Sequence, residues 1–221
     1  FNITKFSDEL LNDIESLKSE ILTIAEFFKG QGDPDCKIQN TIDPYVLKLV
    51  KLAPQKPASE RIDLIAGRWQ QVWGPYDNRN SGRVVDPTFD PENIFQVVSP
   101  DGYYWNVGRN LNKKTGKVKR IGLLRGEYKP ADGNNIRIKF TKLKKLKVKK
   151  IPHGFKLTDL PFYAERKKLK GMRTALPGLF VRLFFPKGTL REVYTDKNLR
   201  LTYGSDDKGI PFATGVIIDK K

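Results

Sequence analysis

The chain contains very few of the residues on which covalent cross-links and metal sites depend. Its 221 residues include one cysteine, Cys36, and one histidine, His153. A single cysteine excludes an internal disulfide and any chemistry that requires a pair of thiols, and it also excludes the ligand spacing of a zinc finger. The sequence therefore predicts neither a metal site nor a cofactor.

Long apolar runs and catalytic signatures are also missing. No run approaches the roughly 20 apolar residues of a membrane-spanning helix, so we expect a soluble or peripheral protein. No GxSxG or HExxH motif stands near His153, and no feature pairs two carboxylates for acid–base work. The segment NKKTGKV, residues 112–118, lacks the upstream glycine and the final Ser or Thr of a phosphate-binding loop and predicts a hairpin turn instead. We therefore predict that the protein is not an enzyme.

Positive charge is what the chain has in excess. Lysine and arginine number 41 against 25 acidic residues, which gives a formal net charge of +16. The excess is concentrated in residues 112–120, 139–150 and 165–171. An anionic surface or polymer is the expected partner, and the sign of the charge by itself does not choose between acidic lipid and nucleic acid.

The first part of the chain is predicted to be helical. Apolar residues recur at intervals of three and four over residues 6–30, with Ser7 as the expected N-cap and Gly30 as the end. A second, shorter helix is expected to begin at Asp43 and Pro44, because aspartate caps a helix well and proline suits the first helical position.

From residue 67 onward, short runs of β-branched and aromatic residues alternate with turn signals, which is typical of an antiparallel meander. Eight strands are expected, at residues 67–73, 93–99, 103–111, 117–128, 135–143, 188–195, 198–204 and 212–219. About eight strands can close into a barrel, which leaves no exposed edges. We therefore divide the chain into an N-terminal helical segment, residues 1–58, and a mainly β antiparallel up-and-down barrel, residues 59–221, with the helices packed on its outside or across one mouth.

Aromatic residues in two of the strands are candidates for an interior site. Alternation places Trp69 and Trp73 on one face of the first strand, with Trp73 deeper in the lumen. In the third strand Tyr103 and Trp105 share a face and Tyr104 lies opposite. Trp69 is interpreted either as a plug that closes the barrel or as a residue that contacts a ligand.

Two motifs in the chain resemble those of a known family. The stretch GRWQQVW, residues 67–73, resembles the Gly-x-Trp motif of the first strand of lipocalin-like barrels. The stretch YTDKNLRLTYG, residues 194–204, resembles the C-terminal signature YLDEDLRI of the plastid lipid-associated proteins, the fibrillins (PAP/fibrillin family) of plastids and cyanobacteria. The residues that carry the match are Gly67, Trp69, Tyr194, Asp196, Leu199 and Arg200.

The resemblance implies a fold, a site and a function. It implies a lipocalin-like barrel in which Arg200 lies across the ring of Trp69 as a cation–π pair, with Asp196 as a hydrogen-bond partner. It also implies a protein that binds or sequesters a prenylquinone, carotenoid or similar apolar lipid or isoprenoid. The implied locations are the periphery of the thylakoid, the cyanobacterial cytoplasm, or the plastid with its plastoglobules. The residues predicted for ligand binding or barrel closure are Gly67, Trp69, Trp73, Tyr103, Trp105, Asp196 and Arg200.

The lysine-rich stretch KFTKLKKLKVKK, residues 139–150, is a candidate membrane-surface patch. Its predicted members are Lys142, Lys144, Lys145, Lys147, Lys149 and Lys150. They form a solvated face or bind anionic lipid headgroups while Leu143, Leu146 and Val148 dip into the interface. Three classes of function therefore stay open: a binder of apolar molecules, a structural coat of lipid globules without an internal ligand, and a basic nucleic-acid-binding module.

Overall fold

The computed structural model of the chain describes residues 13–33, 35–74, 89–112, 114–148, 151, 156–165, 173–176, 187–206 and 217–221. Several positions named above lie outside these described residues. They are Ser7, Lys149, Lys150, His153 and residues 212–216 of the last predicted strand. The first helix begins at Ile14 with Asp13 as its N-cap, so the prediction of Ser7 as the N-cap was wrong.

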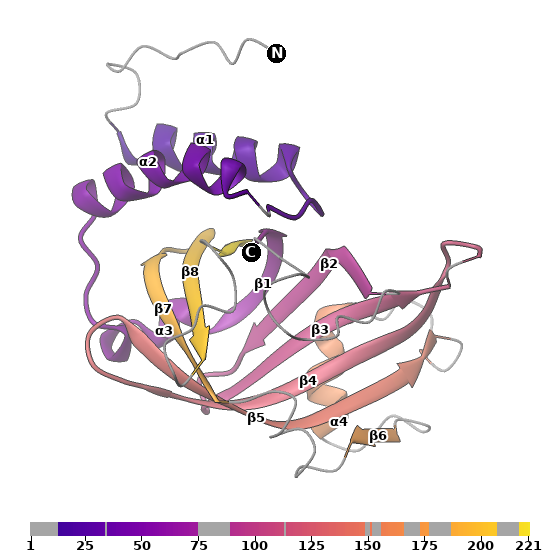
Figure 1. Cartoon of the computed structure of the whole chain (residues 1–221). Helices are drawn as coiled ribbons and strands as arrows, with labels where there is room; N and C mark the ends of the chain where they lie inside the picture. The colour runs from indigo at the N-terminus through magenta and orange to yellow at the C-terminus, as the bar shows by residue number, and fades with distance from the viewer. Residues whose placement is uncertain are drawn as a thin grey trace.

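The strands of the described residues form one antiparallel sheet that closes on itself (Figure 1). They are β1 Gly67–Trp73, β2 Phe89–Val98, β3 Tyr103–Leu111, β4 Val118–Pro130, β5 Asn135–Lys147, β6 Arg173–Leu176, β7 Gly188–Thr195, β8 Leu199–Asp206 and β9 Ile217–Lys220. Their order is β4-β3-β2-β1-β9-β8-β7-β5-β6, and β4 also pairs with β5, so eight strands form a ring and β6 is added alongside β5. The prediction of a mainly β, antiparallel protein is confirmed.

Each of the eight predicted strands has a counterpart among the described residues, the last one from residue 217 onward, and β5 is longer than predicted. This strand continues past Leu143 into the lysine stretch and ends at Lys147. The continuation is stabilised because β4 is equally long and pairs with it as far as Arg120, with Leu146 opposite Ile121. Leu146 is only 1% exposed, so burial of this side chain holds the end of the strand in place.

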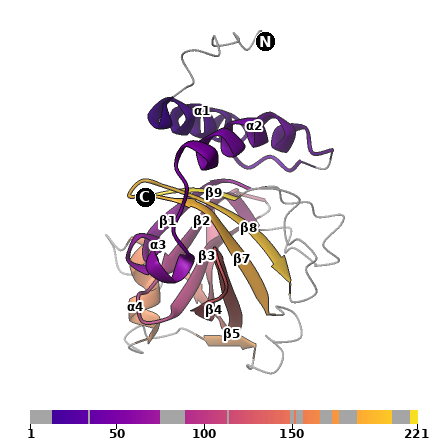
Figure 2. The ribbon, with the colours of Figure 1, turned by 90° about the vertical axis from the view of Figure 1, so that its left-hand side faces the viewer.

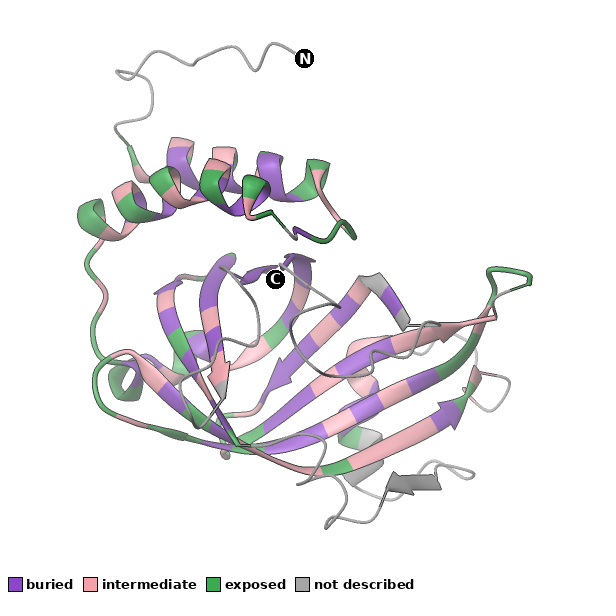
Figure 3. Cartoon of the chain, viewed as in Figure 1, coloured by how far each residue is buried: buried purple, intermediate pink, exposed green. Residues whose placement is uncertain are grey.

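Two helices cover the outer side of the sheet (Figure 2). They are α1 Ile14–Phe27 and α2 Lys37–Leu52. Figure 3 shows buried positions on the sides of the helices and strands that face one another. Leu17, Ile21 and Leu49 of the helices share one apolar cluster with Trp73 and Leu201 of the sheet. Of the two positions predicted for the helices, on the outside of the sheet or across one mouth, the structure shows the outside.

The predicted start of the second helix was wrong. The helix begins at Lys37, six residues before Asp43, and Pro44 lies inside it. The buried carboxylate of Asp33 accepts hydrogen bonds from the backbone N–H groups of Ile38 at 3.1 Å and Gln39 at 2.7 Å. Because these donors of the first turn are satisfied from outside the helix, it starts without a capping residue of its own. Pro44 is exposed and lacks only one intrahelical hydrogen bond.

Short helical turns pack against two sides of the ring. The turns η1 Ala58–Glu60 and α3 Ile62–Ile65 lead into β1, and Ala58 and Ile65 join an apolar cluster with Trp69. The turns η3 Leu157–Asp159 and α4 Leu160–Glu165 belong to the segment that covers the outer side of β2, β3 and β4. Among the described residues, no helix has the length and apolar character needed to cross a membrane.

Candidate binding site inside the closed sheet

Trp69 lies on the inner face of the ring, as predicted, and is fully buried. It packs in the apolar cluster with Tyr104, Ile138 and Leu190, which come from three other strands of the ring. Its indole Nε1 donates a hydrogen bond to the carbonyl of Ile65 at 2.8 Å. The position of Trp69, held by α3 on one side and the sheet on the other, is that of a plug at one end of the interior.

The cation that lies over the Trp69 ring is Lys221 and not Arg200. Lys221 Nζ is 4.8 Å from the ring centroid. Gly67, the first residue of β1, leaves room for this lysine, because a Cβ at position 67 would lie 2.7 Å from Lys221 Cε. The predicted contact between Arg200 and Trp69 was therefore wrong, although both residues lie inside the ring.

Arg200 instead forms a buried ion pair with Glu192. Its Nε donates to Glu192 Oε2 at 2.9 Å and its Nη2 to Oε1 at 2.5 Å, while Nη1 donates to Gln96 Oε1 at 2.6 Å. Burial acts to lower the pKa of the guanidinium, and the charge and hydrogen bonds of Glu192 outweigh it, so the pKa of Arg200 is raised. An arginine that is fully buried and permanently charged needs such a partner.

Asp219 is the second carboxylate beside Arg200, and neither of its oxygens has a hydrogen-bond partner among the described residues. Its Oδ2 lies 3.8 Å from Arg200 Nη1, too far for a hydrogen bond. Burial raises the pKa of Asp219 to about 7, the positive charge of Arg200 opposes this, and the negative charge of Glu192 reinforces it. Asp219 therefore changes charge near neutral pH while it is enclosed in the protein.

These residues form one group on the inner face of β1, β2, β7, β8 and β9, which we call the buried polar cluster. Its members are Gln71, Gln96, Glu192, Arg200, Thr202 and Asp219, and all six are buried. Cross-strand pairing places Arg200 opposite Asp219, Asp219 opposite Gln71 and Thr202 opposite Glu192. Within the described part of the chain, both Asp219 oxygens, Thr202 Oγ1 and Asn106 Oδ1 are buried without a hydrogen-bond partner.

Arg61, which lies between η1 and α3 in the segment before β1, borders the buried polar cluster. Its Nη2 donates to the carbonyl of Glu192 at 3.0 Å and its Nη1 to Gln55 Oε1 at 2.8 Å. Burial lowers the pKa of Arg61, and the carboxylate of Glu192 opposes this shift. The segment that precedes β1 is thus fastened to β7 by a buried side chain.

Apolar side chains line another part of the inner face. Leu124 of β4 is paired with Leu143 of β5 and with Asn106 of β3, so all three share the inner face. Phe140 lies near Tyr104, with a distance of 6.3 Å between their ring centroids. Leu124, Phe140 and Leu143 are only half-buried although they face the interior of the ring.

Asp196 does not contact Arg200, contrary to the prediction. It accepts hydrogen bonds from the backbone N–H groups of Asn198 at 2.7 Å and Leu199 at 2.8 Å, in the turn between β7 and β8. Lys18 of α1 reaches it at 2.7 Å. Burial acts to raise the pKa of Asp196, and the hydrogen bonds from Lys18 and the backbone outweigh it and lower the pKa. Asp196 therefore fastens a helix to a turn and does not line the interior.

Trp73 points away from the interior, which also corrects the prediction. The pairing of β1 with β9 is irregular between Gln71 and Trp73, and such a bulge reverses the face on which the following residue lies. Trp73 packs in the cluster beneath α1 and α2, and its Nε1 donates to the carbonyl of Gln31 at 3.2 Å.

The aromatic residues of β3 are arranged as alternation predicts. Trp105 is buried on the outer face with Leu160, and Tyr103 lies on the same face with Arg125 4.2 Å from its ring centroid. Neither of them is placed to touch a ligand inside the ring. Tyr104, which was not a candidate, is the aromatic residue of this strand that faces the interior.

The lysine stretch is divided between the two faces of the sheet and is not a continuous patch. Alternation along β5 places Lys142 and Lys144 on the outer face and Lys145 and Lys147 on the inner face. Leu146 is buried against the outer side of β4, with Val148 packed on the same cluster, so Leu146 does not enter a membrane interface.

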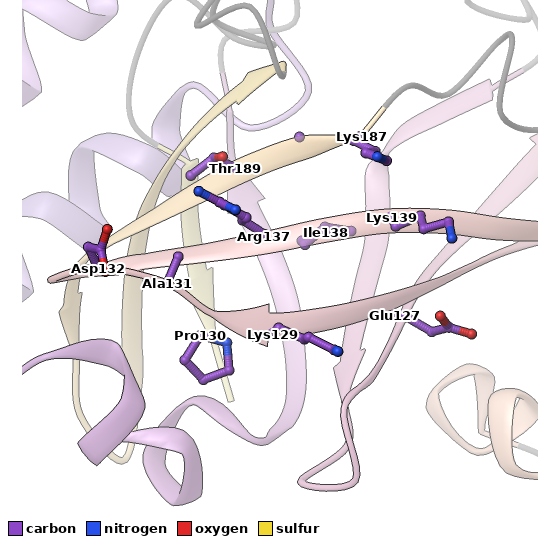
Figure 4. Close-up of a pocket in the computed structure, with 11 residues that line it drawn as sticks. Glu127, Lys129, Pro130, Ala131, Asp132, Arg137, Ile138, Lys139, Lys187 and Thr189 are labelled. Carbon is purple, nitrogen blue, oxygen red and sulfur yellow. The ribbon is translucent and has the colours of Figure 1, made fainter.

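A second basic surface, which the sequence did not indicate, lies on the outer side of β4, β5 and β7 (Figure 4). It is a groove whose cations are Lys129, Arg137, Lys139 and Lys187 and whose carboxylates are Glu127 and Asp132. We call it the basic groove. Lys129, Arg137 and Lys187 are exposed, so the groove presents positive charge to solvent.

In comparisons with known proteins, no family model, no curated protein and no solved structure matches the chain. What defines its class is therefore the structure, a mainly β protein whose closed antiparallel sheet holds a buried polar cluster. Within the described residues, no group of His, Cys, Asp and Glu is placed to hold a metal ion.

Proposed function

We propose that the protein binds a small apolar molecule inside the closed sheet and catalyses no reaction. The observation that carries this proposal is the state of Leu124, Phe140 and Leu143, which face the interior but are only half-buried. Interiors of folded proteins are close-packed, so apolar side chains that face inward without being covered are a suitable wall for an apolar ligand. Trp69 closes one end of the same interior and would keep water out.

The finer description of the fold belongs to the same proposal. The ring of eight strands would be a lipocalin-like up-and-down barrel, as the Gly-x-Trp motif at Gly67 and Trp69 implies. The resemblance to the plastid lipid-associated proteins makes prenylquinones, carotenoids and related isoprenoids the ligands to test first. It also suggests photosynthetic membranes or lipid particles as the place where the protein acts.

An anionic membrane surface is the partner that the charge favours. The basic groove and the exposed Lys142 present cations on the outer side of β4 and β5. Each lysine or arginine near an acidic bilayer contributes about 1 kcal/mol to binding. The protein would therefore approach the membrane with this side of the sheet.

Two measurements test the apolar ligand. Native mass spectrometry and lipid extraction of the protein purified from its own host should find an isoprenoid that travels with it. Titration with a quinone should quench tryptophan fluorescence in the wild type and much less in Trp69→Phe, because Trp69 is the inward-facing indole. Trp73→Phe and Trp105→Phe are matched controls that should leave the quenching in place. If nothing apolar travels with the protein and no quinone quenches it, the structural coat becomes the better interpretation.

The membrane contact is tested by vesicle binding with two matched variants. Substituting Lys129→Gln, Arg137→Gln and Lys187→Gln in the basic groove should weaken binding to anionic vesicles, and Lys142→Gln with Lys147→Gln should weaken it less. Binding should also weaken between low and physiological salt, because screening shortens the reach of surface charges. Equal binding to neutral vesicles would show that the attraction is not electrostatic. Tighter binding to single-stranded nucleic acid would favour the nucleic-acid-binding module.

A further inference from the structure

The buried polar cluster contains oxygen atoms for which the described residues offer no donor. They are both carboxylate oxygens of Asp219 and the hydroxyl of Thr202. A buried polar group without a hydrogen bond destabilises a folded protein by about 1–3 kcal/mol, and native proteins contain few of them. Two such residues on neighbouring strands therefore require an explanation.

The position of these atoms connects them with the apolar wall. Asp219 of β9 and Thr202 of β8 lie on the inner face of adjoining strands. Across the ring, Asn106 of β3 has a third unpartnered oxygen, and its cross-strand neighbour is Leu124. Hydrogen-bond acceptors and half-buried apolar side chains thus share one interior, which suits a ligand with an apolar body and a polar head.

The charges in the buried polar cluster determine which polar head group of a ligand can bind there. The two guanidinium N–H groups nearest to Glu192 are already used in the ion pair between Arg200 and Glu192. An anionic head would be repelled by Glu192 and Asp219. An ammonium group would be attracted by these carboxylates, but it would meet the positive charge of Arg200 beside Asp219 and would lose its hydration on burial. A neutral donor avoids both costs.

We infer that the ligand carries a hydroxyl head that donates a hydrogen bond to Asp219, with Thr202 as a second contact. This inference rests on the function proposed above and specifies the chemical class of its ligand, an apolar molecule that ends in a free alcohol or phenol. The geometry that carries it is the placement of the unpartnered oxygens of Asp219 and Thr202 on the same inner face as Leu124 and Leu143.

The charge state of Asp219 provides a second readout. The charged groups that face it are Arg200 on β8 and Glu192 on β7, while β1 and β2 present the neutral side chains of Gln71 and Gln96. Burial raises the pKa of this carboxyl to about 7. A hydroxyl donor stabilises the carboxylate form, so binding releases a proton and affinity for the alcohol should rise as pH increases through neutrality.

The test uses two probes that differ only in the donor, para-nonylphenol and its methyl ether para-nonylanisole. Each is titrated against the full chain by displacement of the neutral fluorescent probe N-phenyl-1-naphthylamine. A hydrogen bond to a charged group corresponds to a preference of about 10-fold or more for the phenol. The preference should grow with pH, whereas affinity for the ether should not change.

Paired threonine variants separate the contact from a general effect on folding. Thr202→Val removes a hydroxyl that has no bond to lose, and it should reduce the preference for the phenol severalfold without unfolding the protein. Thr195→Val is the control, because the Thr195 hydroxyl is buried and already bonded to Glu192 at 3.3 Å. Thr195→Val should leave the preference unchanged. Asp219→Leu should abolish both the preference and its pH dependence.

The outcomes distinguish this inference from the function on which it rests. If the phenol and the ether bind equally well at every pH, the hydroxyl inference is wrong and the apolar binding function stands. If neither probe displaces the dye, both fail. If Thr202→Val and Asp219→Leu keep the full preference of the wild type, the phenol binds elsewhere and the assignment to the buried polar cluster is overturned.

Discussion

The interior of the closed sheet has two regions that are stabilised in different ways. Around Trp69 the side chains are mostly apolar. The indole N–H and the Tyr128 hydroxyl donate to the carbonyls of Ile65 and Ser99. Around Arg200 the side chains are charged or polar, and Asp219 and Thr202 are buried without hydrogen-bond partners. The first region has the composition of a protein core, and the second has the composition of a site.

This difference separates stability from specificity. Apolar burial contributes roughly 25 cal/mol for each Å² removed from water, so the Trp69 region stabilises the fold directly. A buried ion pair such as Arg200 with Glu192 recovers little more than the cost of its desolvation. Under the proposed function, the polar residues on the inner face would serve the binding of a ligand and not stability.

The largest expected effect on stability comes from the apolar region around Trp69. Trp69→Ala should lower the free energy of unfolding by about 3–5 kcal/mol, as is typical when a buried aromatic side chain is deleted. Urea denaturation followed by circular dichroism measures this loss. Trp69→Phe is the control and should cost clearly less, because most of the packing survives. A loss below about 1 kcal/mol for Trp69→Ala would contradict the role of Trp69 as a plug.

An effect of similar size is expected in the polar region around Arg200, where a second substitution should restore part of the stability. Arg200→Met should destabilise the protein by about 3–5 kcal/mol, because Glu192 is left buried without its partner. The double variant Arg200→Met with Glu192→Leu removes both charges and should be more stable than Arg200→Met alone. Denaturation of the single and double variants measures this rescue. If the loss of stability in the double variant equals the sum of the losses in Arg200→Met and Glu192→Leu, the two residues are not energetically coupled.

An effect of comparable size, visible only as a change in stability with pH, is expected from Asp219. Its pKa in the folded protein is raised to about 7 by burial, whereas an unfolded aspartate titrates near 4, so the unfolded chain loses the proton first as pH rises. The free energy of unfolding should therefore fall between about pH 4 and pH 7 by roughly 4 kcal/mol, because each unit of difference in pKa corresponds to about 1.4 kcal/mol. Asp219→Asn should remove this slope and gain stability relative to the wild type at pH 8. A variant with the same slope as the wild type would show that another group titrates.

The smallest expected effect concerns Lys221 and the ring of Trp69. Lys221 is exposed, so its cation–π contact is worth no more than about 1 kcal/mol. Lys221→Ala should lower the free energy of unfolding by that amount or less, and high salt should reduce the difference further. A large loss would show that this residue holds the end of the ring closed by more than its charge.

The strands and helices were largely predictable because their signals are local. The alternation of Ile136, Ile138 and Phe140 shows which side of β5 is inside, and the spacing of apolar residues shows which side of α1 is buried. The start of α2 was not predictable from Asp43 and Pro44. The carboxylate that satisfies its first turn belongs to Asp33, which lies outside the helix.

The site was harder to predict for the same reason. The sequence did contain one signal of the site. Glu192 is a carboxylate that stands between Leu190 and Tyr194 in a strand, two residues from each of them. Its partner could not be identified from the chain order, because Arg200 reaches it from β8 and is itself held by Gln96 of β2. Asp196, which stands beside the motif arginine in sequence, turned out to hold α1 through Lys18.

The sequence by itself determined a basic, mainly β chain with a helical beginning, and it determined that Trp69 faces the interior. These properties depend on composition and on the two-residue period of a strand, which each segment carries in its own residues. The tertiary structure alone decided that Trp73 faces outward, that Lys221 lies over Trp69, and that Arg200 meets Glu192 and Asp219. Each of these depends on a bulge or on the closure of the ring, and both are set by pairing between strands far apart in the sequence.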